Sequence, residues 1–301
     1  MINWIETNIL DRIKNPNLDF YAKIKKSNFE KVSFDTAAIN VAKELQNLNK
    51  KIFVSFSGGY DSEFVVRKLH FLKIEFTPII VHLETHSSER EYAYKTLREL
   101  NIKAKILKLS NYEYFNLYAN FIHKKFNSFE SSPIPIFLMS YVNDENGILI
   151  DGTGIGGMNC LPLHIINSTT GPKEFENRII DQINKNNINY NFVSEQRYYL
   201  REQESYWPYL YPDSFYIFFM QNPQIVVSML DSISPSDKTW NDYKERIFQL
   251  TWRPKLREVF FEKENFNYSK TIKQIDSLRK YKPNHVVFFG NKQQLRSLIT
   301  D

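Results

Sequence analysis

Glycine is scarce in this sequence and is concentrated in two places. Only 9 of the 301 residues are glycine, about 3% against a usual proportion of about 7%. Six of them fall in two short segments: Gly58 and Gly59 in the first, and Gly152, Gly154, Gly156 and Gly157 in the second. Glycine adopts positive φ angles and permits close backbone approaches that a Cβ would block. We therefore expect tight loops, and a binding site, at these two segments.

The first glycine pair stands between a strand pattern and a helix pattern. Residues 52–56 are apolar and β-prone, and residues 62–72 carry apolar side chains at helical spacing. In a strand, tight loop and helix, the free N–H groups and the helix dipole together favour a phosphate or carboxylate. Ser57 and Ser62 add hydroxyl donors, and Asp61 is a candidate Mg²⁺ ligand. The simpler interpretation is an ordinary glycine turn capped by Asp61 or Ser62.

Strand and helix patterns alternate through the first half of the chain. Strands are predicted at 52–56, 76–83, 103–109 and 147–151, and helices at 62–72, 87–100, 112–126 and 134–141. This alternation predicts an α/β fold, with a parallel sheet, right-handed crossovers and helices on both faces. Ligands of such sheets bind at the carboxyl ends of the strands. Both glycine segments, and residues 81–84 between them, belong to that edge.

The chain divides into three predicted segments. Residues 1–48 are expected to be a helical lead-in, residues 49–172 the α/β domain, and residues 173–301 a mainly helical region that completes the binding pocket. The helices predicted in the last segment are 174–183, 213–220, 223–230, 241–250 and 268–278, with a short last strand at 286–289.

Composition excludes several classes of protein. The chain is 42% hydrophobic and 24% charged, which is a globular profile. Cys160 is the only cysteine, so a disulfide framework, an intrachain cysteine-based zinc cluster and a two-cysteine redox relay are excluded. The formal net charge of +5 is too small to demand a nucleic-acid partner. Because no signal peptide and no apolar stretch of spanning length is evident, we expect a cytoplasmic protein without a membrane partner.

The hexapeptide SGGYDS after the apolar strand resembles the SGGxDS loop of the PP-loop ATP pyrophosphatases, the adenine nucleotide α-hydrolase superfamily. It lacks the Lys-Ser or Lys-Thr ending of a Walker A loop and the spacing of the dinucleotide fingerprint. The resemblance implies a Rossmann-like domain and cleavage of ATP between the α and β phosphates, with Mg²⁺. The residues implied to bind the pyrophosphate portion are Ser57, Gly58, Gly59, Tyr60, Asp61 and Ser62.

The resemblance also implies roles for residues outside this loop. Family members hold adenine against the strand that follows, which makes His82, Leu83 and Glu84 the candidates for base and ribose contacts. C-terminal cations of the family often reach back to the phosphates. Lys255 and Arg257 are chosen for this catalytic role beside Asp61, and a solvated helix start is the alternative.

The second glycine segment, DGTGIGGMN at residues 151–159, resembles the glycine-rich loop of the asparagine-synthetase branch. By this resemblance Gly152, Thr153 and Gly154 contact the nucleotide, and Asp151 joins Asp61 as a metal ligand. Gly156, however, stands where that branch carries an acid, which places amide formation in doubt. The alternative is a loop needed only for packing. Residues 87–102 are similar to asparagine-synthetase C-terminal domains and to phosphoadenosine phosphosulfate reductases.

The resemblance predicts an adenylating ligase or adenylyltransferase that forms AMP and pyrophosphate. The acceptor is expected to be a small molecule and the nucleophile to be external, either free ammonia or a group supplied by an ammonia- or sulfur-donating partner protein. Ile2 replaces the cysteine of glutamine-using enzymes, and no cysteine follows Cys160 for reductase chemistry. Two alternatives stay open. The net charge and an aromatic stretch at 198–211 suggest a tRNA-modifying ligase, and the missing acid at Gly156 suggests a non-catalytic ATP-binding module.

Overall fold

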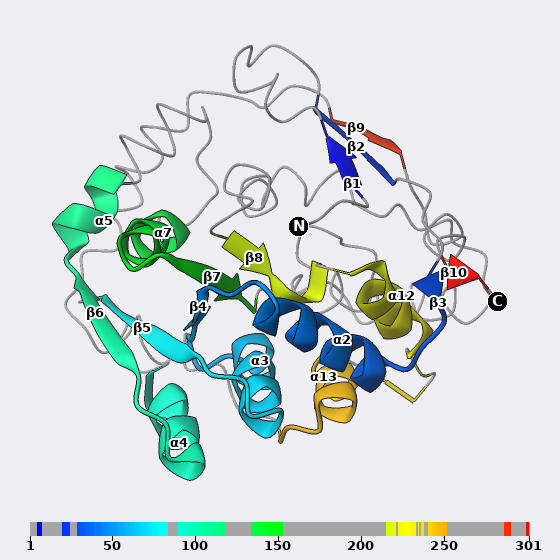
Figure 1. The fold of residues 1–301 in the computed structure, drawn as a ribbon, viewed down its shortest axis with the longest axis horizontal. Helices are drawn as coiled ribbons and strands as arrows, with labels where there is room; N and C mark the ends of the chain where they lie inside the picture. The colour runs from blue at the N-terminus through cyan, green and yellow to red at the C-terminus, as the bar shows by residue number, and fades with distance from the viewer. Residues whose placement is uncertain are drawn as a thin grey trace, which may run out of the picture.

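The structure is a computed structural model that describes residues 5–7, 20–24, 29–83, 90–117, 134–152, 215–220, 222–232, 234, 236–237, 240–251, 286–289 and 299–300. Its centre is a five-stranded sheet of order β6-β5-β4-β7-β8 (Figure 1). These strands are β4 (Lys51–Ser55), β5 (Thr77–Leu83), β6 (Lys105–Leu109), β7 (Gly147–Asp151) and β8 (Phe215–Ile217). Every neighbouring pair is parallel, which confirms the predicted α/β fold class.

Helices cover both faces of this sheet. They are α2 (Phe34–Gln46), α3 (Tyr60–Phe71), α4 (Arg90–Leu100), α5 (Asn111–Leu117) and α7 (Ile134–Asp144). Figure 1 shows α2, α3 and α4 on one side of the sheet and α7 on the other. The strands and helices predicted in this half of the chain are confirmed wherever the structure describes them, with ends shifted by a few residues.

The two central strands are apolar because both of their faces are covered. Ile52, Phe53 and Val54 of β4 are buried in succession, and so are the first four residues of β7. Such continuous apolar runs are typical of parallel strands between two helical layers. Helix α2 begins after Ser33, whose hydroxyl accepts the N–H of Thr36 at 3.2 Å, an N-terminal cap that fixes where the helix starts.

Part of the C-terminal region completes the sheet, which corrects one prediction. The helix predicted at 213–220 is wrong, because the described part is strand β8 followed by a single 3₁₀ turn, η2 (Phe218–Met220). A short apolar run does not distinguish a buried strand from a buried helix, and here its backbone pairs with β7 at the sheet edge. The helices predicted at 223–230 and 241–250 are confirmed as α12 (Pro223–Asp231) and α13 (Trp240–Phe248).

The chain ends contribute smaller sheets. Strand β1 (Ile5–Thr7) pairs antiparallel with β2 (Phe20–Ile24), which pairs parallel with β9 (Val286–Phe289), the predicted last strand. Strand β3 (Phe29–Glu30) pairs parallel with β10 (Ile299–Thr300). The expected helical lead-in thus holds three short strands besides α2, and the division into three segments stays a prediction. Among the described helices, none has the length and apolar character needed to cross a bilayer.

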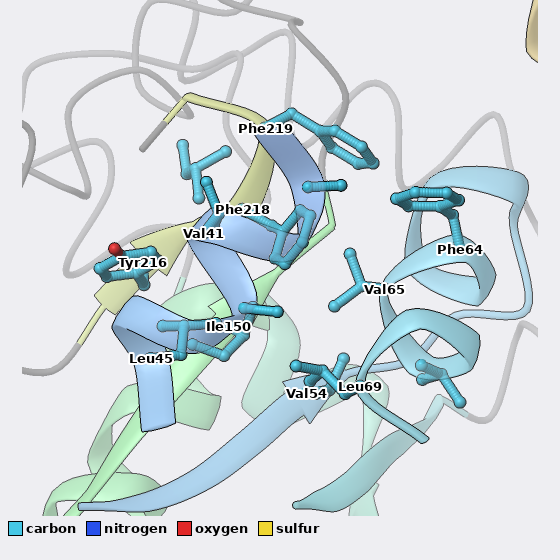
Figure 2. Close-up of a cluster of buried hydrophobic side chains, with 14 of the residues drawn as sticks. Val41, Leu45, Val54, Phe64, Val65, Leu69, Ile150, Tyr216, Phe218 and Phe219 are labelled. Carbon is cyan, nitrogen blue, oxygen red and sulfur yellow. The ribbon is translucent and has the colours of Figure 1, made fainter. Parts of the chain in front are cut away.

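One hydrophobic core joins the early and late parts of the chain. Figure 2 shows Val41 and Leu45 of α2, Val54 of β4 and Ile150 of β7 gathered with side chains of α3, β8 and η2. Five phenylalanines on one side of this core form what we call the phenylalanine cluster: Phe34, Phe64, Phe218, Phe219 and Phe248. Phe64 of α3 stacks on Phe248 of α13 with ring centroids 4.6 Å apart. This contact fixes α13 against α3.

Candidate functional site

The site predicted from glycine lies where the order of the strands changes direction. From β4 the chain proceeds through α3 to β5 on one side, whereas β7 lies on the other side of β4. The ends of β4 and β7 are level, since Ser55 is the register partner of Asp151. Open parallel sheets bind their ligands at such a switch point, outside the carboxyl ends of the strands. Both glycine segments begin there.

The loop between β4 and α3 requires its first glycine. Gly58 has a φ of 85°, in the left-handed region that favours glycine. Gly59 is the N-cap of α3 and makes no side-chain cap hydrogen bond, so the cap predicted at Asp61 or Ser62 is not formed. The hydroxyls instead brace the loop: Gly59 N–H donates to Ser57 Oγ at 3.3 Å, and Ser62 Oγ donates to the Gly59 carbonyl at 3.0 Å.

Gly152, at the end of β7, lies against the start of α3. A Cβ built on Gly152 would stand 2.7 Å from Ser62 Cα and 3.0 Å from the Asp61 carbonyl carbon. Those are backbone atoms, which cannot turn aside as a flexible side chain can. The structure therefore brings the beginning of the second glycine segment into contact with the first. Asp151, the last residue of β7, immediately precedes Gly152, so it belongs to the same edge as Asp61.

Asp61 is paired with a lysine that the sequence analysis did not select. Lys244 Nζ of α13 donates to Asp61 Oδ2 at 2.5 Å, and the two side chains are only 11% and 23% exposed. The other oxygen, Asp61 Oδ1, is buried and has no hydrogen-bond partner within the described part of the chain. Beside this pair, the Tyr60 hydroxyl donates to Glu245 Oε1 at 3.5 Å. Tyr60 and Asp61 at the start of α3 thus contact Glu245 and Lys244 of α13.

Three anchors hold α13 in this position. Tyr243 is fully buried and its hydroxyl donates to the Met229 carbonyl at 2.6 Å. Arg246 Nε donates to Asp237 Oδ1 at 3.0 Å, and this hydrogen bond raises the pKa of Arg246. Phe248 is 5% exposed within the phenylalanine cluster. Because these residues flank Lys244 in the helix, the lysine is presented to the loop from a fixed backbone.

A second acid follows the loop and is also buried. Glu63, in the first turn of α3, is 1% exposed. Its Oε1 accepts from Arg67 Nε at 2.7 Å and from Thr96 Oγ1 of α4 at 3.1 Å. Arg67 also donates to Glu99 Oε2 at 2.5 Å. This network ties the start of α3 to α4 and fixes the direction from which α3 approaches the loop. The sequence analysis missed it, although an acid amid the apolar residues of a helix was a usable signal.

Asp61 and Asp151 suit a magnesium ion that is shared with a bound phosphate. Mg²⁺ in nucleotide sites is typically held by one or two carboxylates, with phosphate oxygens and waters as the remaining ligands. The buried, unpartnered oxygen of Asp61 is the kind of group that a cation would satisfy. No cluster of three or more acidic, histidine or cysteine side chains able to hold a metal occurs among the described residues. Asp61 and Asp151 would supply the two carboxylates of such a magnesium site.

His82 and Leu83 lie at the end of β5, the neighbour of β4. Leu83 is 6% exposed, and His82 is half-buried. Burial, and then the charges of Arg90 and Lys108, lower the pKa of His82 and favour its neutral form. A neutral imidazole offers one donor and one acceptor, as contacts to a nucleoside require. Their contact with a base stays a prediction.

Several predicted site residues lie outside the described residues. These are Glu84, Thr153, Gly154, Lys255 and Arg257, together with Gly156, at which the acid of the asparagine-synthetase branch is missing. Of the predicted set, the structure brings together Ser57, Gly58, Gly59, Tyr60, Asp61, Ser62 and Gly152, with Asp151 beside them. It adds Lys244, Glu245 and Glu63.

No family model and no curated protein matches the chain. Similar solved structures include an NH3-dependent NAD synthetase from Campylobacter jejuni, which is 15% identical and has a TM-score of 0.31 over 43% of this chain and 60% of its own. An NMN synthetase from Francisella tularensis is 12% identical with a TM-score of 0.32, over 84% of this chain and 99% of its own. A tRNA thiolase from Methanococcus maripaludis is 12% identical with a TM-score of 0.30, over 83% and 80%.

Proposed function

We propose that this chain is an ATP pyrophosphatase of the PP-loop type, which cleaves ATP between the α and β phosphates and adenylates an acceptor. One observation carries the proposal. The SGGYDS loop lies between a central parallel strand and a helix at the switch point of the sheet, with Gly152 packed against it. That is the place and the local structure that the resemblance implied.

Different residues of the loop and its neighbours are proposed to contact different parts of the triphosphate. The start of α3 offers backbone N–H groups and a positive dipole to the β and γ phosphates, and Ser57 and Ser62 add hydroxyls. Asp61 and Asp151 hold Mg²⁺, which when bound neutralises charge on the phosphates. Lys244 is paired with Asp61 at the start of α3, and Lys255 and Arg257 remain proposed as further phosphate contacts. Catalysis then rests on positioning and on stabilising negative charge.

The remaining parts of the proposal concern the nucleoside and the acceptor. His82, Leu83 and Glu84 hold adenine and ribose, and Thr153 and Gly154 extend the phosphate contacts from the second glycine segment. The acceptor is a small molecule in the cytoplasm whose adenylate is attacked by an external nucleophile from an ammonia- or sulfur-donating partner. This places the chain among adenylating ligases or adenylyltransferases that are asparagine synthetase-like or phosphoadenosine phosphosulfate reductase-like.

The test follows the products of ATP labelled at the α phosphate, with Mg²⁺ and a cell extract as the source of acceptor. AMP and pyrophosphate are expected from the wild type, and Asp61→Asn should lower their formation by about 100-fold or more, since it removes a carboxylate proposed to hold the Mg²⁺ that neutralises the phosphates. Asp35→Asn is the matched control. Asp35 also lies in the first turn of a helix and pairs with a lysine, Lys68, but on α2. It should keep wild-type activity.

Other outcomes distinguish the alternatives. ATP that binds without being cleaved under any acceptor condition would favour the non-catalytic module. Product formation stimulated by the tRNA fraction of the extract, with binding that weakens steeply as salt is raised, would favour the tRNA-modifying ligase. ADP as the product would contradict cleavage between the α and β phosphates.

A further inference from the structure

The ion pair between Asp61 and Lys244 presents a conflict with metal binding. Asp61 is the carboxylate best placed to hold Mg²⁺, yet one of its oxygens already accepts from the Lys244 ammonium at 2.5 Å. Both side chains are largely withdrawn from water, at 23% and 11% exposed, so their charges are poorly screened. A divalent cation placed on Asp61 would stand beside that ammonium. Asp61 Oδ1 is still open to a cation, but the nearby ammonium charge weakens the binding of Mg²⁺ there while Lys244 stays where it is.

Lys244 can move its ammonium without moving its helix. The backbone of α13 is held by Tyr243, Arg246 and Phe248, as described above. A lysine side chain, by contrast, has a flexible four-carbon stem and a head that donates in several directions. Its ammonium can therefore turn away from Asp61, and the oxygens of a bound polyphosphate would offer it negative charge in place of that carboxylate.

We propose that Lys244 makes metal binding at Asp61 conditional on polyphosphate. In the ligand-free chain Lys244 neutralises Asp61 and weakens the binding of free divalent cations. With metal and polyphosphate bound together, Asp61 would hold the metal and the Lys244 ammonium would contact the phosphate oxygens. This inference rests on the proposed function, since it needs a phosphate ligand at the loop. It adds a residue and a coupling that the SGGYDS motif does not contain.

If this coupling holds, neutralising Lys244 should change the affinity for free metal and the affinity for the metal–nucleotide complex in opposite directions. In Lys244→Met, Mn²⁺ alone should bind about 10-fold more tightly than to wild type, because Asp61 is freed from its partner. The complex of Mn²⁺ with α,β-methylene ATP, which cannot be cleaved between those phosphates, should bind about 10-fold more weakly, because a phosphate contact is lost. Electron paramagnetic resonance measures free Mn²⁺, and equilibrium dialysis measures the bound nucleotide.

Lys68→Met is the matched control for this experiment. Lys68 is 13% exposed in its side chain and pairs with Asp35, as Lys244 pairs with Asp61. Lys68, however, lies in the last turn of α3, at the opposite end from the loop. It should leave both affinities unchanged. Lys244→Gln serves as a second neutral variant, with thermal unfolding by circular dichroism to establish that each protein is folded. The same opposite changes are expected from it.

The outcomes separate this inference from the proposed function. Opposite changes in the two affinities support it. Affinities that fall together, or that both stay at the wild-type values, overturn it, because a lysine that only stabilises the fold would act in one of those ways. A wild-type chain that binds no Mn²⁺–nucleotide complex overturns the proposed function first, and this inference with it.

Discussion

At the scale of single residues, Gly152 and Gly59 differ in what an added methyl group would meet. At Gly152 it would meet backbone atoms of Ser62 at 2.7 and 2.9 Å, whereas at Gly59 it would meet only Ser57 Oγ, at an ordinary 3.5 Å. Gly59 also has a φ of −75°, which alanine adopts without strain. These two glycines therefore differ in whether the structure requires them. Gly152 lets β7 and α3 touch, whereas the backbone of Gly59 accommodates a side chain.

Gly152→Ala should lower the free energy of unfolding by about 1–3 kcal/mol, because the added methyl overpacks a contact between two backbones. It should also weaken ATP binding, since the start of α3 is displaced. Gly59→Ala is the control and should change the free energy of unfolding by about 0.5 kcal/mol or less. Urea unfolding of both variants measures the difference. Equal losses in the two would contradict the close approach of β7 and α3.

The lowered pKa of His82 predicts a dependence of stability on pH. Burial, and then Arg90 and Lys108, hold this pKa below the ordinary value of 6.5. Between the lowered pKa and 6.5 the unfolded chain binds more protons at this residue than the folded chain does. The contribution to stability therefore rises with pH through this window and is lost as the pH falls below 6.5. His82→Gln should remove that part of the slope in urea unfolding measured on both sides of the window. Parallel profiles for the two proteins would refute the prediction.

At the scale of elements, α13 matters most because it carries both the cation of the site and an anchor in the core. Phe248 packs against both Phe64, with ring centroids 4.6 Å apart, and Phe219, at 5.5 Å. Lys244 is four residues earlier in the same helix, so it lies about one turn away. The phenylalanine cluster thus sets where the ammonium of Lys244 stands, and packing and the site are coupled through one short helix.

Phe248→Ala should lower the free energy of unfolding by about 3–5 kcal/mol, the usual cost of deleting a buried ring. Phe71→Ala removes the same ring from a position that is 76% exposed at the end of α3. It should change stability by about 0.5 kcal/mol or less. Milder truncation, Phe248→Leu, keeps the chain folded and should weaken nucleotide binding by loosening α13. Wild-type nucleotide affinity in a folded Phe248→Leu protein would argue against the coupling of packing to the site.

At the scale of the whole molecule, the sequence predicted what depends on neighbours in the chain. The strand before Ser57, the loop and the helix after it are local patterns, and so is the alternation that places them in a parallel sheet. Lys244 could not be chosen over Lys255, because which cation reaches Asp61 depends on how α13 packs on α3. Strand β8 was taken for a helix because its short apolar run fits both, and only its pairing with β7 decides.

The outer strand pairs also bear on how the chain is made. Phe20 of β2 pairs with Val286 of β9, and Phe29 of β3 pairs with Ile299 of β10. During synthesis the amino-terminal strands leave the ribosome long before their partners, and non-local pairs of this kind close slowly. Strands β4, β5, β6 and β7 pair with one another within residues 51–151, so their partners are synthesised much sooner. The nascent chain therefore carries unpaired strand edges at β2 and β3 until β9 and β10 have been synthesised, and exposed edges of this kind favour aggregation.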